Sequence, residues 1–469
     1  MDTRSRKRTA NDLLRTTDTT DTTDTTDTTS LSRRTLLRTT GAAGLAGAAT
    51  MMGRRSAFAA PAIRTTANRA ASQVSGKITL AYLGTAEQAD AWNKLFALFQ
   101  QTYPNIQLEA QSNPIDNWAG FFDAISTQIA GGNVPDVIQV ATEGQRLFAS
   151  RNLCHPINDL LERDKDEMAD YFADVSPKLL EWDKQYTIAA DGSRYYLPSD
   201  FNTMCYWYNA DVLSAAGVPA PTDDWTWDNL MAMGEPLKAM GVYTLAVAPA
   251  YFAGIMPFLL TNGASSLSAD WSTATINTPQ AIEAATFMQT MVTNGYSPIP
   301  GGTFDAFTTT AQGKLAAFGG GRWPIINIRN LDAVSKMKIV AWPQKTQKGS
   351  PVGWNAYPIM KDSQNVEAAW AFVKFMTSAQ ASQFAITEGG STVVPGRKSV
   401  ATSQAFLDNA PAGMDELYPA LDYATPIPSP DKGNVVQTAI EDAFTQILTG
   451  AVSPEDGLNA LNDTIQGDL

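Results

Sequence analysis

The sequence predicts an α/β fold, with parallel strands alternating with helices, in a chain long enough for two domains. The first observation is a strand–helix alternation that starts near Lys77 and is typical of parallel strands joined by crossover helices. The second is a length of 469 residues, 44% of them hydrophobic and 17% charged, which is enough for two cores and excludes a disordered protein. The third is that one histidine and two cysteines exclude a disulfide scaffold, a four-thiolate metal site and a two-histidine zinc site.

The charge of the chain is unevenly distributed. Residues 1–59 carry ten basic and six acidic side chains, although the whole chain has a net charge of −13. The remainder therefore has 24 basic and 41 acidic side chains, a net charge of −17. Such an acidic balance argues against nucleic acid or anionic lipid as the main partner of the protein.

The basic N-terminal segment has the features of an export leader. Residues 1–30 contain an Asp-Thr-Thr repeat, which has no apolar face to bury and is predicted to be disordered. Residues 32–38 (SRRTLLR) resemble a twin-arginine export signal and precede a weakly apolar run that is too short to span a bilayer, which takes about 20 residues. Residues 57–59 form a small-residue cleavage site.

The leader predicts the destination of the protein better than its route. Leu36 stands where the twin-arginine signal usually has phenylalanine, so the twin-arginine and general secretory routes both stay open. No cysteine near the cleavage site provides a lipid anchor, and the rest of the chain shows no transmembrane helix. We expect the mature chain to begin near Ala60, in the periplasmic or extracellular space.

The first half of the mature chain supplies the clearest alternation. Residues 78–83 read as a strand ended by glycine, and the following segment has aromatic and leucine side chains at helical spacing up to Pro104. Residues 106–110 alternate as a second strand, residues 121–129 form a second helix, and residues 135–140 read as a buried third strand. We assign the apolar helical positions, Trp92 among them, to the core.

The second half continues the same pattern with longer helices. Apolar residues at helical spacing predict helices over 278–292, 366–376 and 435–448. Proline-bearing polar stretches near 295–303, 343–351 and 424–432 are predicted loops or crossings between domains.

Five local motifs, taken in order, give the sequence a family resemblance. The most specific runs from YYLP at 195–198 through YWYNADVL at 206–213 and AGVP at 216–219 to TWDNL at 226–230. The other motifs are FQQTYPNI at 99–106, IAGGNVPDVI at 129–138, the segment 304–323 with QGKLAA and GGRW, and EAAWAFV at 367–373 with VPGR at 394–397. This ordered set is similar to extracellular solute-binding proteins of family 1, the sugar-binding receptors of ABC importers.

The resemblance implies a two-lobed periplasmic-binding-protein fold of type II, with the ligand in a cleft between the lobes. After the leader (1–59) and a linker (60–75), it places lobe I at 76–200 with 356–416 and lobe II at 201–355 with 425–469. It also implies that the chain crosses the hinge near Pro198–Met204, Val352–Ala356 and Leu417–Ala424.

Polar side chains near strand ends are the first group of candidate ligand-binding residues. In open α/β sheets, ligands bind at the carboxyl ends of the strands, and sugar hydroxyls require short polar groups that donate and accept hydrogen bonds. The hinge crossings implied by the resemblance add further positions. This group comprises Thr85, Glu87, Thr142, Glu143, Asp200, Asn202 and Asn355. For Glu87, capping of the following helix is the alternative role.

Aromatic side chains form the second group, because the apolar faces of a sugar stack on aromatic rings. Trp323 follows three glycines, Trp354 lies at an implied hinge crossing, and Tyr251 precedes Phe252 in a loop. Core packing is the alternative for each of these rings. Arg397 completes the set, with a surface loop position as its alternative role.

The predicted function is a secreted receptor that binds a mono- or oligosaccharide and delivers it to an ABC permease. We expect a monomer that binds no nucleic acid, holds no cofactor or metal and has no catalytic residues. One alternative keeps the fold but binds a glycerol phosphoester or a polyamine. Another is a carbohydrate-active enzyme using Asp200 and Glu143, since glycoside hydrolysis needs two carboxylates. Whether Cys154 and Cys205 pair is left open.

Overall fold

The computed structural model describes residues 73–469, except 85–87, 116, 188, 302–303 and 389. All of the described residues belong to the unit Ala60–Leu469. The predicted export leader and the candidates Thr85 and Glu87 lie outside the described residues. Within the described part, no helix has both the length and the apolar character needed to cross a membrane.

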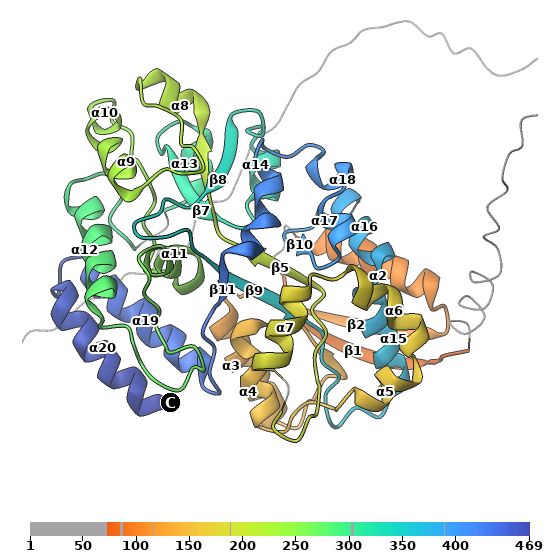
Figure 1. Cartoon of the computed structure of the whole chain (residues 1–469). Helices are drawn as coiled ribbons and strands as arrows, with labels where there is room; N and C mark the ends of the chain where they lie inside the picture. The colour runs from red at the N-terminus through yellow and green to blue at the C-terminus, as the bar shows by residue number, and fades with distance from the viewer. Residues whose placement is uncertain (1–72, 85–87, 116, 188, 302–303, 389) are drawn as a thin grey trace, which may run out of the picture. The chain divides into compact units, whose positions relative to one another are not determined.

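The first sheet confirms the parallel alternation expected for the N-terminal half. Its strand order is β2 (Ile106–Asn113), β1 (Gly76–Leu83) and β3 (Val137–Ile138), and both pairings are parallel. The crossovers contain α2 (Ala89–Thr102) and α3 (Trp118–Ala130). Figure 1 shows α2 and α15 (Val366–Met376) gathered near β1 and β2.

A second, mixed sheet joins strands from distant parts of the chain. Its order is β10 (Val394–Pro395), β5 (Asp200–Thr203), β9 (Ser350–Ala356) and β11 (Ala424–Pro426), and β4 (Val140–Ala141) also pairs with β9. The pairs that β5 makes with β9 and β10 are antiparallel. The β4–β9 pair is antiparallel as well, whereas β9 and β11 are parallel. The expectation of parallel strands is therefore wrong for the pairs that involve β4, β5 and β10, because β5 and β9 run in opposite directions.

The third sheet has a hydrophobic core on each face. It consists of β7 (Ala317–Gly320), β6 (Cys205–Asn209) and β8 (Met337–Ala341), all antiparallel. Cys205 and Trp207 belong to one hydrophobic cluster, whereas Tyr206 and Tyr208 belong to another. This division follows from the two-residue period of a strand, which points successive side chains to opposite faces.

The longer helices lie where apolar spacing predicts them. α12 (Pro279–Thr293), α15 and α19 (Gly433–Leu448) confirm the three helices expected in the second half. Thr278 starts α12, because its side chain accepts a hydrogen bond from the Ala281 amide and proline follows at the first helical position. The other helices of at least eight residues are α4 (Thr142–Ser150), α6 (Lys165–Asp174), α7 (Pro177–Tyr186), α16 (Ala379–Thr387) and α20 (Pro454–Asp468).

Short helices connect these elements. They are α5 (Asn158–Arg163), α8 (Ala210–Ala215), α9 (Trp227–Ala232), α10 (Gly234–Ala239), α11 (Met256–Thr261), α13 (Ala306–Ala311), α14 (Ile325–Asn330), α17 (Lys398–Ala401), α18 (Gln404–Leu407), the π-helix η2 (Tyr251–Ile255), and the 3-10 helices η3 (Met414–Leu417) and η4 (Pro419–Asp422). α12, α19 and α20 pack on one another at one side of the molecule (Figure 1).

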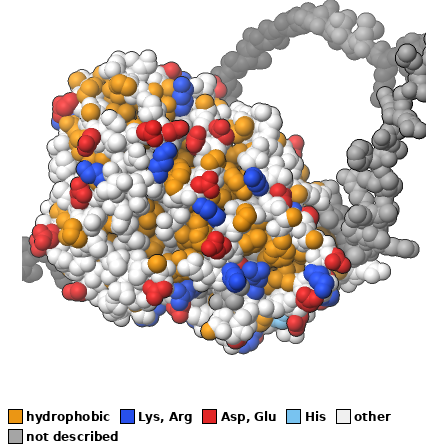
Figure 2. Space-filling model, viewed as in Figure 1, with side chains coloured by type: hydrophobic (Ala, Val, Ile, Leu, Met, Phe, Trp, Pro, Cys, Tyr) orange, Lys and Arg blue, Asp and Glu red, His pale blue; other side chains and the backbone are white. Residues whose placement is uncertain are grey.

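The structure shows the state of the two cysteines and the distribution of charge on one face of the molecule. Cys154 and Cys205 are both buried free thiols, and the Cys154 sulfur lies 3.4 Å from the hydroxyl of Tyr196. Acidic and basic side chains are interspersed with apolar ones on the face drawn in Figure 2, rather than gathered by sign.

Candidate ligand-binding site

The site is built on one face of the β5–β9 strand pair. The antiparallel register places Asp200 opposite Asn355 and Asn202 opposite Gly353. Because side chains alternate along a strand, these four residues share a face, and we call them the floor of the site. Phe201 and Trp354, which lie between them, point the other way and are fully buried in the core.

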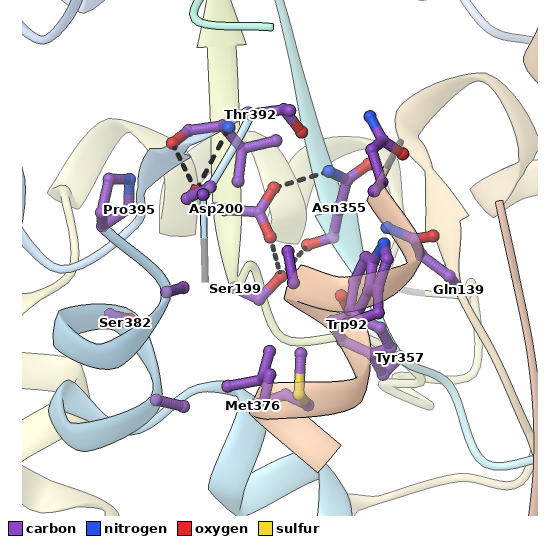
Figure 3. Close-up of a pocket in the computed structure, with 18 residues that line it drawn as sticks. Trp92, Gln139, Ser199, Asp200, Asn355, Tyr357, Met376, Ser382, Thr392 and Pro395 are labelled. Atoms are coloured by element: carbon purple, nitrogen blue, oxygen red, sulfur yellow. Dashed lines mark hydrogen bonds between the residues drawn. The ribbon is translucent and has the colours of Figure 1, made fainter. Parts of the chain in front are cut away.

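A pocket of about 740 Å³, partly open to solvent, lies at the Asp200 end of the floor. Its lining combines apolar and polar side chains. Figure 3 shows polar side chains of the lining gathered around Asp200 and Asn355. Ser199 donates a hydrogen bond to Asp200 Oδ2 at 2.6 Å, and Asn355 Nδ2 donates to Oδ1 at 2.5 Å. Further residues that line the pocket are Gln139, Trp92, Tyr357, Met376, Ser382 and Thr392.

Asp200 lies in an environment that disfavours its charged form. Burial raises the pKa of this carboxyl from 3.8 to about 6, although the hydrogen bonds from Ser199 and Asn355 act in the opposite direction. Its two acceptor atoms are already engaged by protein donors. A ligand in this pocket would therefore meet a carboxyl group whose orientation is set before binding.

The raised pKa of Asp200 predicts a pH-dependent gain in stability for Asp200→Asn. Between about pH 4 and 6 the folded state keeps a proton that the unfolded state loses, so this group's contribution to stability falls as the pH rises. Asparagine removes that penalty, while its oxygen still accepts from Asn355 and its amide donates to Ser199. We expect the melting temperature of the variant to exceed that of the wild type by more at pH 7.5 than at pH 4.5. An equal difference at both pH values, in thermal unfolding followed by circular dichroism, would contradict this account.

The other end of the floor lies beneath an aromatic pair. The rings of Phe252 and Trp323 are both partly exposed, and their centroids are 6.1 Å apart. A Cβ atom at Gly353 would lie 3.3 Å from the Phe252 ring. Because glycine has no Cβ atom, the ring can approach the floor. At Gly321, a Cβ atom would lie 2.5 Å from the Trp323 ring and 2.6 Å from Asn202 Oδ1. Glycine is therefore needed at position 321 to seat Trp323 beside Asn202.

The N-terminus of α4 supplies Thr142 and Glu143 to the same end. The Thr142 hydroxyl accepts a hydrogen bond from the Trp354 amide at 2.8 Å, so this side chain fastens α4 to β9. Glu143 is 7% exposed, and its Oε2 would be 3.9 Å from a Cβ atom at Gly353. Burial, together with the charge of Glu441, raises the pKa of Glu143 to about 7.

Three candidates from the sequence lie in the core instead of lining the site. The Tyr251 hydroxyl lies 2.7 Å from Ser266 Oγ and donates to the carbonyl of Pro428, and the ring is buried. Trp354 is fully buried, on the opposite face of β9 from the floor. Arg397 is also buried, where it donates to the carbonyl of Thr377 and pairs with Asp170 at 3.0 Å.

Several residues that line the pocket are not predicted from the sequence. The helical pattern predicts Trp92 in the core, yet this residue is only partly buried and lines the pocket, and its ring centroid lies 4.9 Å from that of Tyr82. Gln139 is a polar residue between the apolar residues of a strand predicted to be buried. This polar position is the feature of the sequence that could have identified it as a site residue. Tyr357 follows Asn355 by two residues and lines the same pocket, so the two-residue period of a strand predicts its direction once Asn355 is placed.

Two α/β lobes around a polar and aromatic site define a two-lobed substrate-binding protein. The chain belongs to the bacterial extracellular solute-binding protein family, whose model matches residues 85–383. Among the residues that the structure describes, no group of three or more potential ligands could hold a metal ion.

Curated relatives and solved structures agree with this membership. The multiple sugar-binding protein of Streptococcus mutans is 24% identical over 350 residues, which cover 70% of this chain and 77% of that protein. An ABC substrate-binding protein from Listeria monocytogenes, solved in complex with cycloalternan, has a TM-score of 0.73 at 23% identity and covers 84% of this chain and 99% of that one. Maltose-bound MalE3 of T. maritima has a TM-score of 0.71 at 22% identity, covering 84% of this chain and 100% of that one.

Proposed function

We propose that the protein is an extracytoplasmic receptor that binds a mono- or oligosaccharide and delivers it to the permease of an ABC importer. The observation that carries this proposal is the partly exposed Phe252–Trp323 pair above a floor of carboxyl and amide groups. Aromatic faces suit the apolar side of a sugar ring, and carboxyl and amide groups suit its hydroxyls. The curated relatives named for sugars support the same class of ligand.

Closure of two lobes on the ligand is the proposed mechanism. The implied division is lobe I (76–200 with 356–416) and lobe II (201–355 with 425–469). Separate hydrophobic clusters lie around β1 and around α12, and the cluster around β1 also takes in Trp207 and Phe318 from the implied lobe II. The ligand would then be held by groups from both lobes, and binding would shift the population toward the closed form. Export by the leader and action as a monomer belong to the same proposal.

Isothermal titration calorimetry of the mature chain against a panel of mono- and oligosaccharides tests the function. We expect one or more members to bind with a dissociation constant in the micromolar range or below, with a matching increase in melting temperature. A folded protein that binds no carbohydrate would refute the sugar assignment.

The structure does not favour the phosphoester alternative. A phosphate ligand would require basic side chains directed at the site. Arg397 is paired with Asp170. The guanidinium of Arg322 lies 4.8 Å from the centre of the Phe406 ring and donates to the carbonyl of Ser391, a residue that lines the pocket. Of these two arginines, only Arg322 keeps buried donors without a partner among the described residues, at Nε and Nη2, and one buried arginine falls short of the several basic side chains that a phosphate ligand would require.

A further inference from the structure

The Glu143 end of the site is rich in hydrogen-bond acceptors. A Cβ atom at Gly353 would lie 3.9 Å from Oε2 of Glu143, at the start of α4, and 3.3 Å from the Phe252 ring. The preceding residue, Tyr251, contacts Glu441 on α19, so both carboxyl groups lie at this end of the site. Glu441 Oε1 accepts from the Tyr251 amide at 3.0 Å and from Gln437 Nε2 at 3.0 Å. Neither carboxylate forms an ion pair with any of the described residues.

An independent observation at the same place is the side-chain oxygen of Gln437. This residue is 7% exposed, and its Oε1 is a buried acceptor that has no hydrogen-bond partner in the part of the chain that the structure describes. Its amide nitrogen is already used by Glu441. A buried acceptor without a donor costs free energy, so Gln437 Oε1, at the same end of the site as the carboxyl groups of Glu143 and Glu441, requires a ligand that donates.

The basic side chains nearest to this cluster are engaged elsewhere. Arg146, one turn after Glu143 on α4, pairs with Asp431 at 3.0 Å and lies over the ring of Trp271. On α3, Asp123 accepts a hydrogen bond from Asn434, the residue after the first position of α19. Tyr251 contributes a backbone amide from η2. The elements packed around Glu143 therefore bring acceptors and acidic groups, and the basic residues beside them, Arg146 and Lys432, are paired with Asp431 and Asp468.

We propose that this site selects a sugar carrying a protonated amine, with the ammonium group placed between Glu143, Gln437 and Glu441 beside the Phe252 ring. This inference rests on the proposed sugar-binding function and narrows its ligand class. An ammonium group supplies three donors and a positive charge that offsets one of the two carboxylates when the site closes, whereas a hydroxyl donates one hydrogen bond and offsets neither. Charge-assisted hydrogen bonds are also stronger than neutral ones.

The test is calorimetry of the mature chain with matched sugars that differ only in an amine. Glucose, galactose, mannose and cellobiose are each compared with their 2-amino-2-deoxy counterparts and with the N-acetylated forms, which keep the nitrogen but lose the charge. We expect the tightest ligand to be an amine that binds roughly ten- to hundred-fold more tightly than its hydroxyl and N-acetyl counterparts. Glu143→Gln and Glu441→Gln should each reduce that ratio toward one.

Glu455→Gln is the matched control, because this exposed glutamate lies on α20 and changes the net charge by the same amount. It should leave the ratio unchanged. A neutral sugar that binds as tightly as its amine would overturn the inference while leaving the sugar-binding function intact. The absence of binding to every sugar would instead remove the function on which the inference rests.

Discussion

Trp323→Ala is expected to weaken sugar binding by roughly 30- to 1000-fold, which corresponds to about 2–4 kcal/mol. The ring is partly exposed beside Phe252, and it is held above Asn202 by a glycine at position 321. An aromatic ring that is ordered before binding loses little conformational entropy when a sugar stacks on it. Calorimetry with the best ligand of the panel measures the change directly.

The melting temperature of the ligand-free Trp323→Ala variant should remain close to that of the wild type, because a partly exposed ring contributes less to the core than a buried one. Phe172→Ala is the matched control, since this aromatic residue on α6 is 37% exposed and lines a different pocket, which shares no residue with the site. Its affinity for the sugar should be unchanged. A Trp323→Ala variant with wild-type affinity would remove the aromatic platform from the proposed site.

Trp354→Ala is expected to have the largest effect on stability, lowering the free energy of unfolding by about 3–5 kcal/mol. The side chain is fully buried, and its ring is stacked 6.4 Å from that of Trp182. Truncation removes apolar contacts and leaves a cavity next to β9. Denaturant unfolding monitored by circular dichroism should show a lower midpoint for this variant.

Trp354→Phe separates core packing from ligand contact at the same position. The indole nitrogen of Trp354 has no hydrogen-bond partner among the described residues, so phenylalanine loses volume but no hydrogen bond. We expect this variant to recover most of the stability and to bind sugar within about threefold of the wild type, because the ring points away from the floor. A large loss of affinity with normal stability would show that Trp354 contacts the ligand, as the sequence analysis expected.

The two tryptophans show where prediction from sequence succeeds and where it stops. Both follow glycine-containing segments and both were candidate ligand contacts, yet one is partly exposed at the site and the other is fully buried. Their sequence surroundings do not distinguish them. The distinction arises because β9 pairs with β5, whose position in the chain is about 150 residues earlier, and the register of that pair decides which face of β9 meets the site.

Tyr251 and Arg397 illustrate the same limit. Tyr251 and Phe252 are adjacent, and the π-helix at η2 directs one ring to the core and the other toward Gly353. Arg397 is buried because Asp170, 227 residues earlier in the chain, provides its counter-charge. No local pattern around Arg397 contains that information.

The sequence by itself determined the first sheet with its helices, three of the longer helices of the second half, and the family. Helical spacing located α12, α15 and α19, strand alternation located the first sheet, and ordered motifs led to the solute-binding family. These features depend on residues close together in the chain, so the sequence displays them directly. Only the tertiary structure decided which members of each segment reach the site, because side-chain direction at the floor depends on pairing between distant strands, and burial depends on partners that the chain brings together only when it folds.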